Sequence, residues 1–354
     1  MHKPSLRDVS IGLVRQDHLL YGFILAYTAC AIVIGIDTDL PVSGIFAHYF
    51  MPWCVTFGLV FPSLYLTWRF RSWRQTRAEP PHIIAHDPRL FLGTLCAGVL
   101  LALAMVFFQA SFTVVKNALY VWNDGFPLDE LHADIDRMLH GGIDPWRFFE
   151  PLMASNQILN VMEFNYSILW FQLNFGILFI MLVSPGLSHL RSRYFLAFAL
   201  TWIVVGNIFA GLFLSAGPVF YGAVTGDSQR FAELVSLLAA NKDGSYSAAT
   251  YQNYLWTMHV SGTSGLGTGI SAFPSVHVAL TVINMLFAFE IRRSLGIAMT
   301  VYTAIILVTS VACGWHYAID GYASIAICAV LYWALRRIPA LNQGVTRLQP
   351  ATIS

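Results

Sequence analysis

The sequence predicts an all-α membrane protein, a polytopic bundle of about eight transmembrane helices with further helices at the non-cytoplasmic membrane surface. Of its 354 residues, 56% are hydrophobic and only 11% are charged, whereas soluble domains carry about 25% charged residues. Several apolar stretches approach the roughly 20 residues that a helix needs to cross a hydrocarbon core. The net charge of +1 gives no reason to expect a nucleic-acid partner.

Eight apolar stretches are candidate transmembrane helices within one domain, residues 1–354. They are residues 19–36, 45–68, 90–112, 158–183, 195–214, 273–289, 295–313 and 315–335. Because residues 1–17 are polar, the first apolar stretch is predicted to be a membrane helix and not a signal peptide. The five cysteines lie in apolar stretches without a CxxC motif, so we expect buried thiols rather than disulfides or a zinc site.

Positive charges indicate the orientation of these helices. If the N-terminus is cytoplasmic, 15 of the 20 Lys and Arg residues fall on the cytoplasmic side, in agreement with the positive-inside rule. The residues on the other side are Lys116, Arg137, Arg147, Arg230 and Lys242. We therefore expect both termini in the cytoplasm.

Two segments on the non-cytoplasmic side are too long to be simple connections. In residues 113–157, an apolar residue recurs at helical spacing after Pro127, which is typical of a helix lying in the headgroup layer. A second helix is expected to start at Asp144-Pro145. Residues 215–271 contain candidate helices at 230–240 and 250–259 and end in a Gly/Ser/Thr-rich run.

Three ionisable residues are predicted to meet at this membrane face. His277 lies at the start of the sixth predicted transmembrane helix, and His316 and Asp320 lie at the start of the eighth. The seventh helix returns the chain to the same face, and a spacing of four residues places Asp320 beside His316. When an aspartate accepts from one imidazole nitrogen, the other nitrogen is free to act as a nucleophile or base.

The residues before His277 predict an anion site. Pro274 suits the first position of a helix, and the free N–H groups of a helix N-terminus attract phosphate. Ser275 adds a hydroxyl group, so the whole arrangement favours phosphoryl transfer. Structural alternatives are a helix cap for Ser275 and ordinary hydrogen-bonding roles for the other residues. A zinc site made of the two histidines and Asp320 is a further alternative, although no other ligand-rich motif supports it.

These motifs resemble the type 2 phosphatidic acid phosphatase superfamily, and most closely its branch that contains the inositol phosphorylceramide synthases. The matching segments are residues 271–277 (SAFPSVH) and 314–320 (GWHYAID), with a weaker match at 215–221 (SAGPVFY). Residues 128–146 resemble the interfacial segment of the same branch. The resemblance covers about residues 125–335, which would form the catalytic part.

The resemblance implies covalent catalysis without a metal or other cofactor. His316 would attack phosphorus and become a phosphohistidine, and Asp320 would hold its ring and stabilise the positive charge. His277 would protonate the leaving oxygen and then activate the acceptor, as a general acid that becomes a base. Ser275, Tyr221 and Arg137 are the expected phosphate-binding residues.

The sequence departs from the wider superfamily in its cations. A Lys…Arg-Pro motif before the first histidine is absent, and Thr309-Ser310 stands where the superfamily has a Ser-Arg pair. Because a phosphate dianion needs positive charge around it, we expect Arg137, Arg147 or Lys116 to supply that charge. The synthase-like branch also lacks the arginine, so its absence favours this branch.

The predicted function is transfer of a phosphoryl group or phospho-headgroup from a lipid phosphate to a lipid alcohol, as in sphingolipid headgroup transfer, at the non-cytoplasmic leaflet. Hydrolysis of a lipid phosphate or pyrophosphate, with water as the acceptor, is the alternative. A membrane transporter is a lesser alternative, because the sequence has no internal repeat and the histidines lie at the membrane face. A non-catalytic scaffold is disfavoured because all three catalytic positions are filled.

Overall fold

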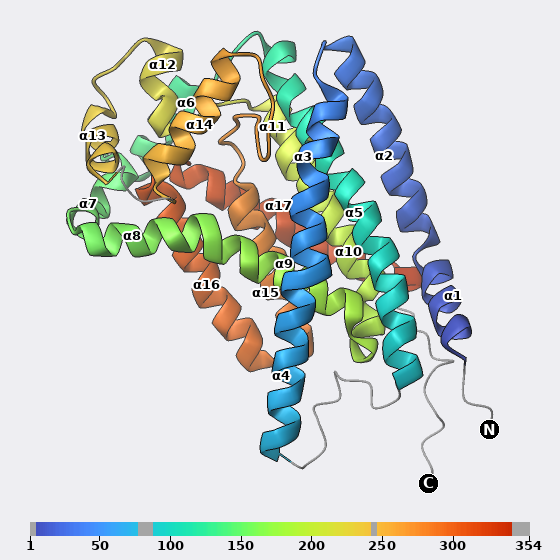
Figure 1. The fold of residues 1–354 in the computed structure, drawn as a ribbon. Helices are drawn as coiled ribbons and strands as arrows, with labels where there is room; N and C mark the ends of the chain where they lie inside the picture. The colour runs from blue at the N-terminus through green and yellow to red at the C-terminus, as the bar shows by residue number, and fades with distance from the viewer. Residues whose placement is uncertain (1–4, 77–87, 242–245, 342–354) are drawn as a thin grey trace.

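The computed structural model describes residues 5–76, 88–241 and 246–341, and the regular structure in these ranges is helical (Figure 1). Seven helical segments are long and apolar enough to cross a membrane. They are His18–Asp37, Val42–Thr67, Arg89–Asn123, Asn156–Val183, Ser188–Leu212, Arg293–Ala312 and Ala318–Arg336. The predicted polytopic helical membrane bundle is therefore confirmed.

Each of these segments consists of one or two α-helices, and three of the segments also contain a π-helical turn. The helices are α2 (His18–Asp37), α3 (Val42–Val55), α4 (Phe61–Thr76), α5 (Pro88–Asn123), α8 (Asn156–Phe164), α9 (Trp170–Val183), α10 (Ser188–Ile203), α11 (Ala210–Leu212), α16 (Arg293–Ala312) and α17 (Ala318–Arg336). The π turns are η1 (Thr56–Val60), η3 (Asn165–Leu169) and η5 (Val204–Phe209). A π turn inserts an extra residue and so changes which side chains share a helix face.

The sixth predicted transmembrane helix corresponds to α15 (Val276–Ile291), which is apolar but only 16 residues long. At 1.5 Å per residue it extends about 24 Å, less than the roughly 30 Å of a hydrocarbon core. It packs against α10, α16 and α17. Because Ser275 and Val276 at its start are buried, α15 begins inside the protein and not at its surface.

The third predicted transmembrane helix, residues 90–112, was ended too early. α5 continues to Asn123, because Val114, Ala118 and Leu119 keep one face of the helix buried. Residues 113–123, which the prediction assigned to the long non-cytoplasmic segment, belong to this helix. A Cβ on Gly35 would lie 2.9 Å from Val114, which shows how closely α2 and α5 approach.

Short helices gather at one end of the bundle, toward the upper left of Figure 1. They are α6 (Asp129–Leu139), η2 (Pro145–Phe148), α7 (Glu150–Met153), α12 (Tyr221–Thr225), α13 (Ala232–Ala240) and α14 (Ala248–Val260). The helices expected near residues 128–138, 230–240 and 250–259 are thus present, and the one expected from Asp144-Pro145 is a 3₁₀ turn followed by α7. α6 is amphipathic, since Leu131 and Met138 are exposed while His132 and Ala133 are buried.

The cysteines are all free, and only two of them are buried. Cys313 and Cys328 are buried as expected, whereas Cys30, Cys54 and Cys96 lie on the outer surface of the bundle. The prediction of burial is therefore wrong for these three. Apolar composition alone does not distinguish a helix face that packs on protein from one that faces lipid.

Some charges that the orientation argument assigned to cytoplasmic loops belong to buried ion pairs. Arg191 Nε lies 2.9 Å from Asp17 Oδ2, and Arg193 Nη2 lies 2.5 Å from Glu290 Oε2. Both arginines are buried in α10, and Asp17 links α10 to the junction of α1 (Leu6–Gln16) with α2. Lys3, Arg77, Lys242 and Arg347, which entered the same argument, lie outside the described residues.

Replacing Asp17 by Ala should lower the free energy of unfolding by about 3–5 kcal/mol, because Arg191 would be left as a buried cation without its partner. Thermal melting in detergent, calibrated by chemical denaturation, measures this loss. The double variant Asp17→Leu/Arg191→Met removes both charges and should recover most of the stability. A single variant as stable as the wild type would contradict the proposed role of the pair.

Candidate active site

The structure brings together the two histidines that the sequence singled out. His277 lies in the first turn of α15, and His316 lies just before α17. Their ring centroids are 6.4 Å apart, and the ring planes are inclined by 56°. The two imidazole rings, one on α15 and one just before α17, are therefore close enough for a single tetrahedral phosphoryl group to lie between them.

Two acceptors hold His316 from one side. Its Nδ1 lies 2.8 Å from the carbonyl oxygen of Ala272 and 3.2 Å from Asp320 Oδ2. A carbonyl oxygen can only accept, so Nδ1 carries the proton and Nε2 keeps its lone pair. Asp320 is fully buried and also accepts from the Tyr317 backbone N–H at 2.9 Å. The sequence predicted the Asp320 contact but not the Ala272 carbonyl.

The environment of His316 keeps its imidazole neutral. Burial lowers the pKa of His316 to about 3, and the positive charge of Lys116 contributes to the lowering, while the hydrogen bond to Ala272 opposes it. The whole residue is 7% exposed. Since only a neutral imidazole has a lone pair to donate, His316 is in the form that a nucleophile requires at physiological pH.

Aromatic rings enclose His277. Its ring is stacked on Tyr166, with centroids 4.3 Å apart, and lies 4.0 Å from the Trp170 ring. Trp170 Nε1 also donates to the backbone carbonyl of His277 at 3.0 Å. The π turn η3 lies between α8 and α9 at this point, and it brings Tyr166 and Trp170 onto the face toward α15. Sequence reasoning missed both residues because a π turn has no simple sequence signal.

Ser275 is the N-cap of α15. Its Oγ accepts from the Val278 N–H at 3.3 Å, its own N–H donates to the Asp320 carbonyl at 3.2 Å, and its carbonyl accepts from Ser324 Oγ at 2.9 Å. The capping alternative is thus realised, and phosphate binding by Ser275 stays a prediction. The placement of Pro274 at the first helical position is wrong, because it precedes the cap and follows a cis peptide bond.

Two buried carboxylates of α6 fasten this helix to the loops around the site. Asp129 accepts from the N–H groups of Ala216 and Gly217 at 2.6 and 2.9 Å and from the Tyr317 hydroxyl at 2.8 Å. Asp136 accepts from the N–H groups of residues 318 and 319 at 3.0 and 3.1 Å and so caps the N-terminus of α17. A spacing of seven residues on a predicted amphipathic helix was the signal that could have identified this pair.

A third histidine, His132, lies on the same face of α6. Its Nδ1 is 3.0 Å from Ser215 Oγ, and its ring centroid is 4.8 Å from that of Phe273. Burial lowers the pKa of His132 to about 4. This neutral histidine therefore joins α6 to the segment that precedes Pro274, and sequence reasoning did not single it out.

The remaining expected phosphate ligands have contacts of their own. Tyr221 is buried at the start of α12, with its ring 5.0 Å from Phe231. Arg137 is exposed at the end of α6, where its Nε donates to the Gly142 carbonyl at 2.8 Å, and Arg147 pairs with Glu233 at 2.9 Å. Within the described residues, none of the three has a hydrogen bond or ion pair to either site histidine.

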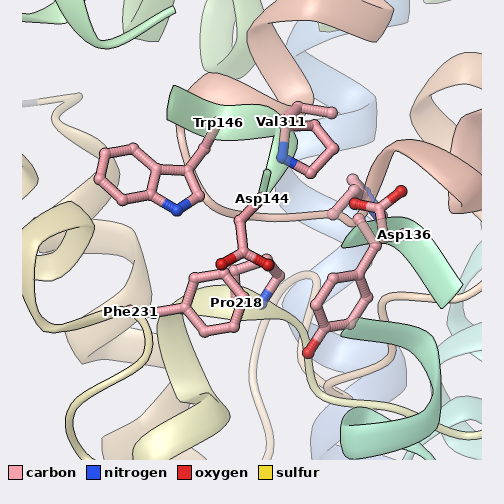
Figure 2. Close-up of a pocket in the computed structure, with 9 residues that line it drawn as sticks. Asp136, Asp144, Trp146, Pro218, Phe231 and Val311 are labelled. Carbon is pink, nitrogen blue, oxygen red and sulfur yellow. The ribbon is translucent and has the colours of Figure 1, made fainter. Parts of the chain in front are cut away.

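A small pocket of about 10 Å³, room for about one water molecule, lies beside His316. Figure 2 shows Asp144, Trp146 and Phe231 on one side of it and Asp136 on the other. Its further lining residues are Pro145, Pro218, Val311, His316 and Tyr317. Trp146 Nε1 is buried and has no hydrogen-bond partner among the described residues. The pocket thus places an indole donor without a partner near the nucleophilic candidate, while Asp136 and Asp144 accept from α17 and Arg230.

The zinc alternative has no support from the geometry. In the described part of the chain, no group of three or more His, Cys, Asp or Glu side chains is placed to hold a metal ion. Asp320 contacts Nδ1 of His316 directly, as an imidazole partner does, instead of sharing a common point with both histidines.

Acidification should destabilise the fold through His132. The folded protein holds the pKa of this histidine at about 4, against 6.5 for a free side chain, so the unfolded chain takes up the proton first as the pH falls. The free energy of unfolding should therefore decrease between about pH 6.5 and 4, by roughly 1.4 kcal/mol for each unit of pKa difference. The melting temperature in detergent, recorded against pH, measures this effect.

The variant His132→Gln should flatten part of this pH dependence, because it removes the group that titrates only in the unfolded chain. His48, which is exposed on α3, provides the matched control, and His48→Gln should leave the curve unchanged. If His132→Gln melts with the same pH dependence as the wild type, His132 is not the group responsible.

The part of the chain that carries this site matches a known protein family. Residues 131–334 match the family model described as the PAP2 superfamily, and this range contains His277, His316 and Asp320. No curated protein and no solved structure matches the chain. Since the matched segment spans more than half of the 354 residues, the chain belongs to the PAP2 superfamily.

Proposed function

We propose that this chain is a membrane-embedded lipid phosphotransferase or phosphatase that works through a phosphohistidine at His316. Membership of the PAP2 superfamily supports a phosphatase or phosphotransferase activity toward lipid phosphates in general. The observation that carries the proposal is the geometry of His316. Its Nδ1 is held by Ala272 and Asp320, and its ring faces His277 at a centroid distance of 6.4 Å.

In the first step, Nε2 of His316 attacks phosphorus, a P–N bond forms and the bond from phosphorus to the leaving oxygen breaks. His277 gives a proton to that oxygen as it leaves. The ring of His316 gains positive charge, which the carboxylate of Asp320 and the carbonyl dipole of Ala272 stabilise. The rings of Tyr166 and Trp170 hold the imidazole of His277 in place, and the negative charge of the bound phosphate favours the protonated form that donates.

In the second step, the acceptor hydroxyl gives its proton to His277 while its oxygen attacks phosphorus. The P–N bond breaks, and the electron pair returns to Nε2 of His316. The enzyme is thereby restored, with His277 protonated for the next cycle. The chemistry is the same for water and for a lipid alcohol, so the group that reaches the phosphoenzyme decides between hydrolysis and transfer.

Within this scheme we favour headgroup transfer to a lipid alcohol. The resemblance of residues 271–277 and 314–320 to the synthase-like branch supports transfer. Phosphate binding by Ser275, Tyr221 and Arg137 is part of the proposal. Of these, Ser275 is the N-cap of α15, two residues before His277.

We also propose that the site faces the non-cytoplasmic side and that both termini are cytoplasmic. The exposed arginines Arg7, Arg15, Arg292 and Arg337 lie on α1 and at the ends of α15 and α17 away from the site. At the site end, Arg147 and Arg230 pair with acidic residues. An excess of unpaired positive charge at one end supports this orientation.

Single cysteines in place of exposed Gly262 and Arg292, introduced after the five native cysteines are replaced by alanine, should report this orientation in sealed vesicles. A membrane-impermeant maleimide added outside inside-out vesicles should label Arg292→Cys and leave Gly262→Cys unlabelled until detergent is added. Vesicles of the opposite orientation serve as the control and should reverse the pattern. Labelling of both positions from the same side would contradict the proposed topology.

Replacing His316 by Ala should abolish the covalent intermediate and lower turnover by more than about 1,000-fold, the order expected when a covalent nucleophile is removed. Purified protein would be mixed briefly with lipids labelled in the phosphate, namely phosphatidic acid or phosphatidylinositol, each with and without ceramide. The wild type should carry an acid-labile, base-stable label. Inorganic phosphate released from phosphatidic acid, or inositol phosphate released from phosphatidylinositol, indicates hydrolysis, and a labelled ceramide product indicates transfer.

His277→Ala should slow both formation and decay of the labelled protein, since His277 acts in both steps. His48→Ala, which removes an exposed histidine from α3, should behave like the wild type. The proposed function is wrong if His316→Ala retains the label, or if no lipid in the set labels or is turned over by the wild type.

A further inference from the structure

Lys116 lies on α5, and its positive charge interacts with both site histidines. Its Nζ lies 5.9 Å from the centre of the Phe112 ring, one helical turn earlier. Among the described residues, no hydrogen bond or ion pair to its ammonium group is recorded, and its side chain is only partly exposed. A lysine without a partner within a membrane-spanning helix costs free energy, so it marks a functional position.

The packing around α5 directs Lys116 toward the site. A Cβ on Gly206 would lie 2.7 Å from Phe112 and 2.9 Å from Val276, so α5 meets the start of α15 at this level. A Cβ on Gly269 would lie 2.9 Å from Cγ of Lys116, so the segment that leads to Ser271 lies along the lysine stem. Asn117 fixes the same contact, since its Nδ2 donates to Thr268 Oγ1 at 3.2 Å.

The electrostatics agree with this placement. The charge of Lys116 contributes to the lowering of the pKa of His316, after burial. The other expected cations are engaged elsewhere, Arg137 with the Gly142 carbonyl and Arg147 with Glu233. Thr309 and Ser310, at the position of the superfamily arginine, donate their hydroxyls to carbonyls of their own helix.

We propose that Lys116 binds the phosphoryl group during transfer and replaces the cations that this chain lacks. The inference rests on the proposed function and assigns a residue that lies before the matched range 131–334. When Nε2 of His316 attacks, negative charge concentrates on the oxygens of phosphorus that are not exchanged. The ammonium group of Lys116 donates to one of these oxygens, and this contact strengthens as the charge grows.

A phosphate-binding role and a purely structural role of Lys116 predict opposite changes in the melting temperature when the lysine is replaced. Lys116→Met keeps the length of the side chain and removes an ammonium group that has no partner. It should therefore raise the melting temperature of the ligand-free protein while weakening the binding of phosphate analogues. If the lysine were part of the fold, the same substitution would lower the melting temperature.

Orthovanadate, a small analogue of the five-coordinate phosphorus, tests the assignment without knowledge of the lipid. Its dissociation constant for the purified full-length protein in detergent would be measured by the shift in melting temperature. We expect Lys116→Met to raise the constant by about 100-fold, the order of one lost electrostatic contact in an active site. Lys116→Arg keeps the charge and should stay within about tenfold of the wild type.

Two controls separate this inference from the proposed function. Arg15→Met removes an exposed positive charge from α1, and its orthovanadate affinity should equal that of the wild type. If His316→Ala loses the affinity but Lys116→Met retains it, the role of Lys116 is wrong and the function stands. If the wild type does not bind orthovanadate, or His316→Ala binds it equally well, the phosphate site itself is wrong and both proposals fail.

Discussion

The hydrogen bond from His316 Nδ1 to the Ala272 carbonyl joins segments 44 residues apart and sets the tautomer of the nucleophilic candidate. Two backbone bonds complete the connection: the Ala272 N–H donates to the Ser215 carbonyl at 2.7 Å, and the Ser275 N–H donates to the Asp320 carbonyl at 3.2 Å. Three loops are thus fixed to one another around a single ring. In a surrounding of low polarity each such bond is stronger, and each missing partner is more costly, than in water.

α6 braces this arrangement from the side. Its buried residues Asp129, His132 and Asp136 reach the loops at 215–217, 273 and 317–319, whereas Leu131 and Met138 on its other face are exposed. An amphipathic helix of this kind is suited to the membrane surface. The exposed face of α6 is thus suited to lipid, while its buried face contacts the loops of the site.

Three cations within the membrane-spanning helices, Arg191, Arg193 and Lys116, fall into two classes. Arg191 and Arg193 are buried in ion pairs with Asp17 and Glu290, at the end of the bundle away from the site. Lys116 is close to the site and, in the described ranges, has no ion pair. A paired charge contributes to a defined fold, whereas an unpaired charge near a reaction centre lowers stability and gains a partner only when an anion binds.

The sequence by itself determined the features that depend on short stretches of chain. Hydropathy identified the membrane helices, a spacing of four residues placed Asp320 beside His316, and the order of helices brought His277 to the same end. The tertiary structure alone decided the partners that come from distant segments: the Ala272 carbonyl, the Tyr166 and Trp170 rings, and the α6 carboxylates. It also decided that α5 continues past residue 112 and brings Lys116 to the histidines, while Arg137 turns back to its own loop. The physical reason is that local periodicity fixes which side of a helix a residue occupies, whereas the packing of helices against one another fixes what that side meets.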